Sequence, residues 1–173
     1  MRWMWIDRIV ELVPRERLVA VKNISLAEDH LHDHFAATPT RGAAPVMPAS
    51  LIIEGMAQTA GILVGHAEGF REKVILAKIG LAEIDEDAGP GSTLRYTATI
   101  RQMDRQGAST DGTIDLVDWA SGETAPRRIG RVELMFSHID QNMAGQKFPE
   151  HNFVFGESFK TLLRLSGVAV PAD

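Results

Sequence analysis

One stretch of the chain decides the fold: residues 49–68, which read ASLIIEGMAQTAGILVGHAE. The stretch lacks proline, is apolar almost all round, and follows Pro48, a residue type tolerated in the first turn of a helix. Its longest apolar part, 51–67, is shorter than a typical membrane span and carries Glu54 and Gln58. We therefore predict a long helix, buried on most sides within a soluble protein.

Six runs rich in β-branched and alternating apolar residues flank this helix. Two precede it and four follow it: 5–13, 17–25, 73–85, 92–104, 108–119 and 127–139. The four later runs follow one another with only short turns between them, which favours antiparallel pairing over alternating strands and helices. The sequence predicts an α+β fold in which one antiparallel six-stranded sheet wraps around one long central helix.

Composition narrows the chemistry. A chain of 173 residues that is 45% hydrophobic fits one compact domain. The absence of cysteine excludes disulfides, a thiolate nucleophile and cysteine-ligated metal sites. The net charge of −5 argues against nonspecific nucleic-acid binding. Residues 1–8 are interrupted by charge and lack a secretory signal, so we expect a cytoplasmic protein without membrane attachment, whose catalysis uses histidine, carboxylates, hydroxyls or backbone groups.

The C-terminal segment, 140–173, contains four of the seven phenylalanines: Phe148, Phe153, Phe155 and Phe159. The spacing of Phe159, Leu162 and Leu163 predicts a short amphipathic helix. Such a segment is expected to pack on its own domain or a dimer partner, or to form a lid over a substrate tunnel. We therefore divide the chain into a main domain, 1–139, and an extension, 140–173.

Glu54 stands inside the apolar run of the predicted helix. Apolar surroundings disfavour the charged form of a carboxylate and raise its pKa, which suits a general acid near neutral pH. Alternatively, Glu54 hydrogen-bonds a buried loop, helped by Gln58 at i+4 on the same helix face. Both interpretations remain open from these residues alone.

Three histidines cluster upstream, at His30, His32 and His34. In an extended segment their alternate spacing puts the imidazoles on one side, where they could bind a metal. They could also be solvated loop residues, or one of them could act together with Glu54.

Residues 23–35 and 45–58 together resemble the 3-hydroxyacyl-[acyl-carrier-protein] dehydratases of the FabA/FabZ type. The pattern of that family is a His-Phe-Pro segment followed by Met-Pro-Gly-x-Leu-x-x-Glu-x-x-Ala-Gln. Here the corresponding residues read His34-Phe35-Ala36 and Met47-Pro48-Ala49-Ser50-Leu51, then Glu54 and Ala57-Gln58. The resemblance extends over about residues 3–139.

This resemblance implies the hotdog fold, a homodimer or trimer of dimers, and no metal or cofactor. It implies that His34 and Glu54 are the catalytic residues, contributed by different subunits, with Gln58 in support. A glutamate rather than an aspartate resembles the FabZ branch, which eliminates water without shifting the double bond. Neutral His34 would remove the proton next to the thioester carbonyl, and protonated Glu54 would protonate the leaving hydroxyl. The backbone N–H of Ala49 would stabilise the carbonyl oxygen.

The implied substrate is an acyl thioester on acyl carrier protein or coenzyme A. Because carrier proteins are acidic, docking would use basic residues, and two candidate groups are Arg127, Arg128 and Arg131, or Arg71 and Lys73.

The sequence departs from the family pattern between His34 and Glu54, where several extra residues (36–44) replace a short turn. This loop either folds outward or reshapes the pocket. Two other functions share the fold: an acyl thioesterase, and a non-catalytic acyl-binding module.

Overall fold

A computed structural model describes residues 3–119, 121–142, 148–149 and 152–170. Its sheet has six strands in the order β1-β2-β4-β5-β6-β3, and every neighbouring pair is antiparallel. The strands are β1 (Arg8–Val13), β2 (Arg17–Asn23), β3 (Val74–Ile84), β4 (Ser92–Met103), β5 (Gly107–Asp118) and β6 (Glu123–His138). The predicted antiparallel six-stranded sheet is confirmed.

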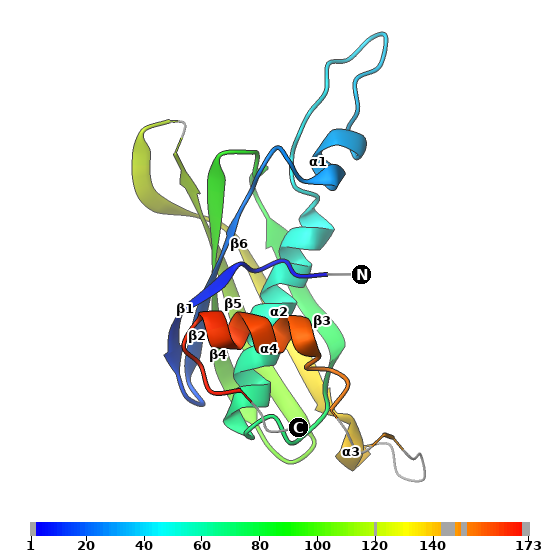
Figure 1. The fold of residues 1–173 in the computed structure, drawn as a ribbon, viewed down its shortest axis with the longest axis vertical. Coiled ribbons are helices and arrows are strands. Elements are labelled where there is room, and N and C mark those ends of the chain that lie inside the picture. The colour runs from blue at the N-terminus through cyan, green and yellow to red at the C-terminus, as the bar shows by residue number, and fades with distance from the viewer. Residues whose placement is uncertain (1–2, 120, 143–147, 150–151, 171–173) are drawn as a thin grey trace.

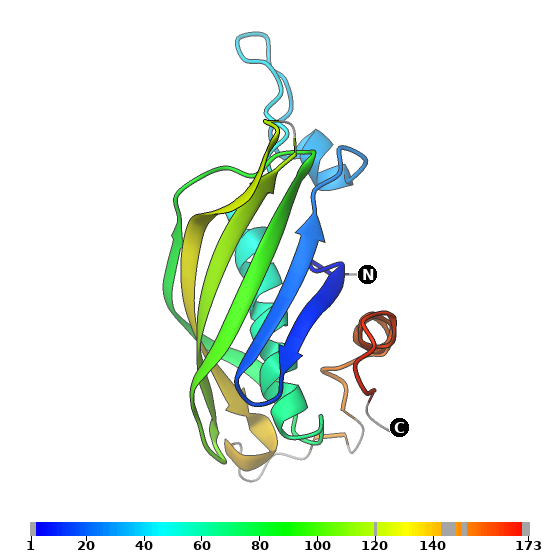
Figure 2. The ribbon, with the colours of Figure 1, turned by 90° about the vertical axis from the view of Figure 1, so that its left-hand side faces the viewer.

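The sheet curves around one long helix, α2 (Ala49–Ala67), which runs along its concave side (Figures 1 and 2). Strand β4 alternates buried and partly exposed residues over its first half, as expected of a strand with one face on a core. Tyr96 of that strand is fully buried against Gly55 of α2. A Cβ atom at Gly55 would lie 2.5 Å from the Tyr96 hydroxyl, so only glycine allows the helix to approach so closely.

The structure departs from the predicted elements in small ways. The first strand begins at Arg8, not at residue 5, and β6 begins four residues earlier than predicted. Two short helices, α1 (Asp29–Asp33) and α3 (Ile139–Asn142), were not predicted. In the described residues, no helix is long and apolar enough to cross a membrane.

The predicted C-terminal helix is confirmed as α4 (Glu157–Leu165), with Leu162 and Leu163 buried. It crosses α2 on the side away from strands β3 to β6 (Figures 1 and 2). The hydroxyl of Ser166, just after α4, accepts a 3.0 Å hydrogen bond from the backbone N–H of Ile9 in β1. Residues 157–166 therefore pack on the rest of the molecule.

The extra residues between His34 and Glu54 form a loop that projects from the body (Figures 1 and 2). The loop is closed at its base, where Ala44 N–H donates to the carbonyl of Phe35 at 3.0 Å. Further out, Thr38 and Arg41 form an antiparallel bridge. Of the two arrangements that the sequence left open, the structure therefore shows the outward one.

Candidate active site

Glu54 lies in the second turn of α2, where it is half-buried. Gln58, one turn later, donates from Nε2 to Glu54 Oε1 at 3.0 Å. The same Nε2 donates to the carbonyl of Trp3 at 2.6 Å, and Gln58 Oε1 accepts from the backbone N–H of Trp5 at 2.9 Å. The predicted i, i+4 pairing on one helix face is therefore present, and the N-terminal segment fixes the amide.

A cavity of about 280 Å³ begins at Glu54 and is lined mainly by apolar side chains. The lining residues from α2 start at Glu54 and continue at positions i+3, i+4, i+7 and i+8 from it, so they lie on one face of the helix. The complete lining is Glu54, Ala57, Gln58, Gly61 and Ile62 of α2, Val74, Ile75 and Leu76 of β3, Phe136 of β6, and Val154, Phe155 and Phe159 of the C-terminal segment. A carboxylate at one end of an apolar cavity suits a substrate with a polar reacting group and an apolar chain.

The first turn of α2 has free donors. Pro48 precedes the helix as its cap, and its carbonyl accepts from the N–H groups of Leu51 and Ile52 at 2.9 and 3.2 Å. The N–H groups of Ala49 and Ser50 donate no hydrogen bond within the described part of the chain. Since Ala49 is exposed, its N–H remains available to a ligand oxygen at the positive end of the helix.

His34 ends helix α1 and is exposed. Its ring lies edge-on to Phe35, with ring centroids 4.2 Å apart. Across the residues that the structure describes, no hydrogen bond joins His34 to Glu54. The single chain therefore brings Glu54 and Gln58 together but does not add His34 to them.

The metal interpretation of the histidine cluster required an extended segment, and the structure has helix α1 there. In a helix, His30 and His32 are two residues apart and do not face each other. His30 instead packs edge-on against Trp5, with centroids 5.1 Å apart. Within the described ranges, no group of three or more His, Asp or Glu is arranged to hold a metal ion.

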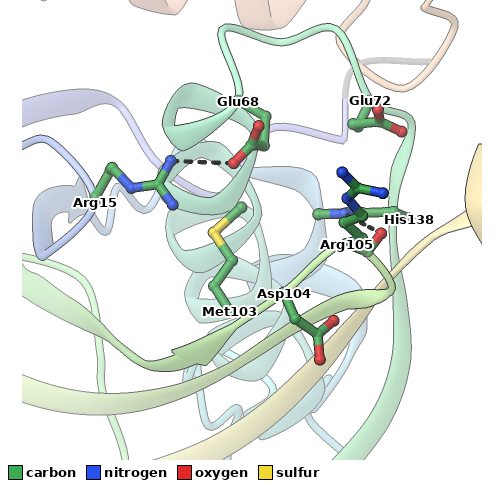
Figure 3. A pocket seen from close by; sticks show the side chains of 7 residues that line it. All are labelled: Arg15, Glu68, Glu72, Met103, Asp104, Arg105 and His138. Atoms are coloured by element: carbon green, nitrogen blue, oxygen red, sulfur yellow. Dashed lines mark hydrogen bonds and ion pairs between the residues drawn. The ribbon is translucent and has the colours of Figure 1, made fainter.

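A larger cavity, about 500 Å³, lies at the other end of α2 (Figure 3). It includes Glu68, fourteen residues beyond Glu54, which corresponds to about 21 Å along the helix axis. Its lining mixes cations and anions, among them an Arg15–Glu68 ion pair at 3.1 Å. None of the predicted site residues lines it, so the smaller apolar cavity is the candidate active site.

The first predicted basic group, Arg127, Arg128 and Arg131, is paired with acids. The partners are Glu86, Asp115 and Glu83, respectively. The hydrogen bond from Arg127 lowers the pKa of Glu86. In the single chain these arginines therefore do not form an unpaired basic patch.

In the second predicted group, Lys73 is buried and paired with Asp140 at 2.9 Å. Burial alone would raise the pKa of Asp140, but hydrogen bonds from Lys73 hold it below its ordinary value. Arg71 is exposed and has no ion pair among the described residues. Among the ion pairs of the described residues, Arg71 alone of the two groups has no acidic partner, so its charge can meet one on another protein.

Comparison with known proteins identifies the family. Residues 2–125 match the family described as FabA-like domain. The chain belongs to this family. Three similar relatives are FabZ 3-hydroxyacyl-[acyl-carrier-protein] dehydratases. They come from Alkalilimnicola ehrlichii (36% identical; 58% of this chain, 63% of the relative), Acidiphilium cryptum (40%; 54% and 54%) and Solibacter usitatus (35%; 70% and 73%). This FabA-like chain thus spans less than two thirds of the first relative's length.

Solved structures support the fold of this FabA-like chain. An acyl-CoA hydrolase from Agrobacterium tumefaciens superposes with a TM-score of 0.55 at 12% identity, over 75% of this chain and 46% of that one. A dehydratase heterocomplex from Xenorhabdus doucetiae gives a TM-score of 0.53 at 14% identity, over 76% and 97%. The hotdog fold is confirmed.

Two parts of the site were not predicted. One is the clamp on Gln58 by the backbone of Trp3 and Trp5, for which the sequence carries no signal. The other is the cavity wall formed by Val154, Phe155 and Phe159. The phenylalanines of the C-terminal segment did indicate docking, but not onto which element.

Proposed function

We propose that this FabA-like chain is a 3-hydroxyacyl-[acyl-carrier-protein] dehydratase, a hydro-lyase that converts a 3-hydroxyacyl thioester into the trans-2-enoyl thioester and water. The observation that carries the proposal is the Glu54 carboxylate, held by Gln58 at one end of an apolar cavity. The family and the FabZ relatives give the reaction class. The use of a carrier-bound acyl chain in fatty-acid or related biosynthesis belongs to the same proposal.

The reaction requires a base and an acid. Neutral His34 takes the proton from the carbon next to the thioester carbonyl and becomes imidazolium. The carbon–oxygen bond at position 3 breaks as protonated Glu54 gives its proton to the hydroxyl, which leaves as water. The electrons of the broken C–H bond form the new double bond, and proton transfer through solvent then resets both residues.

Negative charge develops on the thioester oxygen when the proton is removed. The N–H of Ala49, in the first turn of α2, donates no hydrogen bond among the described residues, and it is the donor we assign to this oxygen. Alanine donates here as glycine does, since the donor is the backbone group.

We propose a homodimer as the active unit, with His34 and Glu54 from different subunits. In support, β3 ends the sheet and exposes apolar side chains: Ile75 is 37%, Leu76 39% and Ile79 45% exposed. An apolar edge strand with unpaired backbone groups is suited to pairing with another chain. Ile75 and Leu76 also line the cavity, so a partner on this edge would border the site. Whether dimers associate further into trimers of dimers stays a prediction, as does the cytoplasmic location.

The test is enoyl-thioester formation from a 3-hydroxyacyl thioester by wild type, His34→Ala and Glu54→Gln. We expect the wild type to be active and each variant to lose on the order of 100-fold or more in kcat. Equal rates in all three proteins would refute the proposal. Release of free acid and carrier thiol without enoyl product would instead identify a thioesterase, and binding without turnover an acyl-binding module.

A further inference from the structure

We infer that the C-terminal segment, residues 152–168, is a fixed wall of the acyl cavity and sets the length of acyl chain that the protein accepts. The inference rests on the proposed function for the identity of the chain that enters. It concerns residues outside the part of the chain that matches the FabA-like family, which ends at residue 125. The family match therefore assigns no role to these residues.

The first anchor of the wall is Asn152. Its Nδ2 donates to the carbonyls of Phe70 and Glu72, at 2.9 and 3.0 Å, just after the end of α2. Its Oδ1 accepts from the backbone N–H of Val154 at 3.1 Å, which fixes the local turn of the segment. The amide nitrogen thus attaches the segment to the residues after α2, and the amide oxygen orders the residues that follow Asn152.

The second anchor is Phe155, which is 3% exposed and seated on Gly65 of α2. A Cβ atom at Gly65 would lie 2.4 Å from the Phe155 ring, so the glycine provides the space that the ring occupies. Phe155 also packs edge-to-face with Phe70 and Phe159, with centroids 4.9 and 5.9 Å away. Beyond it, buried Leu162 and Leu163 fix α4.

Phe155 lines the cavity and contacts α2 at a defined distance along the helix from Glu54. Gly65 is eleven residues beyond Glu54 on the same helix, which corresponds to about 16 Å along the axis. The volume of about 280 Å³ holds on the order of nine groups the size of a water molecule or methylene. Because Phe155 and Phe159 belong to a segment anchored on both sides, a longer chain meets a fixed surface.

The experiment compares chain-length profiles, as kcat/KM for 3-hydroxyacyl thioesters of increasing length. Phe159→Ala enlarges the cavity from the tail side, and Phe155→Leu enlarges it while removing less buried side-chain volume than an alanine substitution would. Gly61→Leu narrows it from α2, since Gly61 lines the cavity and a Cβ atom there would already lie 3.5 Å from the Phe136 ring. Leu165→Ala is the matched control, because Leu165 lies on α4 but is exposed and does not line the cavity.

We expect Phe159→Ala and Phe155→Leu to raise the ratio of kcat/KM for long thioesters to kcat/KM for short thioesters by about tenfold or more. Gly61→Leu should shift the ratio downward, and Leu165→Ala should leave it unchanged. The inference is overturned if Gly61→Leu shifts the profile while both tail variants keep that of the wild type.

Binding separates this inference from the proposed function. Saturated acyl thioesters of N-acetylcysteamine, titrated by calorimetry, report the length preference without any dehydration. If neither the wild type nor any variant forms enoyl product but Phe159→Ala binds longer acyl chains better than the wild type does, the dehydratase proposal is refuted. The inference about the C-terminal segment is then supported. If dehydration is observed and neither Phe159→Ala nor Phe155→Leu changes the length preference in binding, the inference about the C-terminal segment is refuted. The dehydratase proposal is then supported.

Discussion

The side-chain amide of Gln58 donates a 3.0 Å hydrogen bond to Oε1 of Glu54, one turn earlier on α2. The amide itself is held by the backbone of Trp3 and Trp5, and the Gln58 residue is 7% exposed. Because its oxygen accepts a hydrogen bond and its nitrogen donates two, the amide has one orientation. The N-terminal segment therefore determines how the proposed general acid is oriented, although it lies far from Glu54 in sequence.

Replacing Gln58 tests this positioning role. In Gln58→Ala, Glu54 loses its fixed donor while the apolar cavity remains. We expect kcat to fall on the order of 10- to 100-fold with little change in KM for the thioester. Steady-state kinetics, run below the thermal transition of the variant, measure kcat and KM separately. Gln102→Ala, at an exposed glutamine of β4, is the control, and an equal loss in both variants would contradict the role.

The central helix and the sheet were predictable because each is encoded locally. Residues 49–68 are apolar enough to require burial on most sides, and the strand runs are separated by turn residues. Helix α1 was not predictable in this way. It has five residues, too few to be stable alone, and is held by Leu31, which is 2% exposed.

The candidate site was predictable in part. The Glu54–Gln58 contact follows from i, i+4 spacing alone. The wall formed by Phe155 and Phe159 depends on docking onto a glycine ninety residues upstream of Phe155, and no local pattern encodes such a contact. The placing of His34 relative to Glu54 depends on a second subunit if the proposed dimer is correct.

The dimer proposal predicts the effect of a charge on the β3 edge. Ile79→Lys places an ammonium group in the proposed interface, where it would be desolvated without a partner. We expect a change from dimer to monomer in light scattering coupled to size-exclusion chromatography, together with loss of dehydration. Val10→Lys, on the opposite edge strand β1, is the matched control and should remain dimeric. A dimer that persists in Ile79→Lys would argue against this edge.

Tyr96 offers a test of core energetics. Its hydroxyl is buried and has no hydrogen-bond partner within the described residues, and burial raises its pKa. Tyr96→Phe removes an unsatisfied polar group and keeps the ring against Gly55. We expect the free energy of unfolding to rise by about 1–3 kcal/mol, measured in urea at unchanged m-value. Tyr96→Leu, which leaves part of the space empty, should lower it, and a destabilised Tyr96→Phe would show that the hydroxyl is satisfied in solution.

His66 predicts a pH dependence of stability. Burial lowers its pKa from the ordinary value of 6.5, so below pH 6.5 the unfolded chain binds the proton more readily than the folded chain does. Its contribution to stability is therefore fully present above pH 6.5 and is lost as the pH falls below it. Relative to His66→Gln, the wild type should lose stability on acidification from pH 7 to 5. His32→Gln, at an exposed histidine, should follow the wild type.

Mixing two inactive variants tests whether the catalytic pair spans two subunits. His34→Ala and Glu54→Gln homodimers each lack one member of every site. In a mixed dimer, one site combines the intact His34 of one chain with the intact Glu54 of the other, whereas the second site lacks both. Random exchange of subunits should therefore restore about one quarter of wild-type activity. If His34 and Glu54 act within one chain, every site in the mixed dimer is defective and mixing restores nothing. The doubly substituted chain mixed with wild type provides the control for exchange, because none of its mixed dimers has an intact site if the pair is shared between chains.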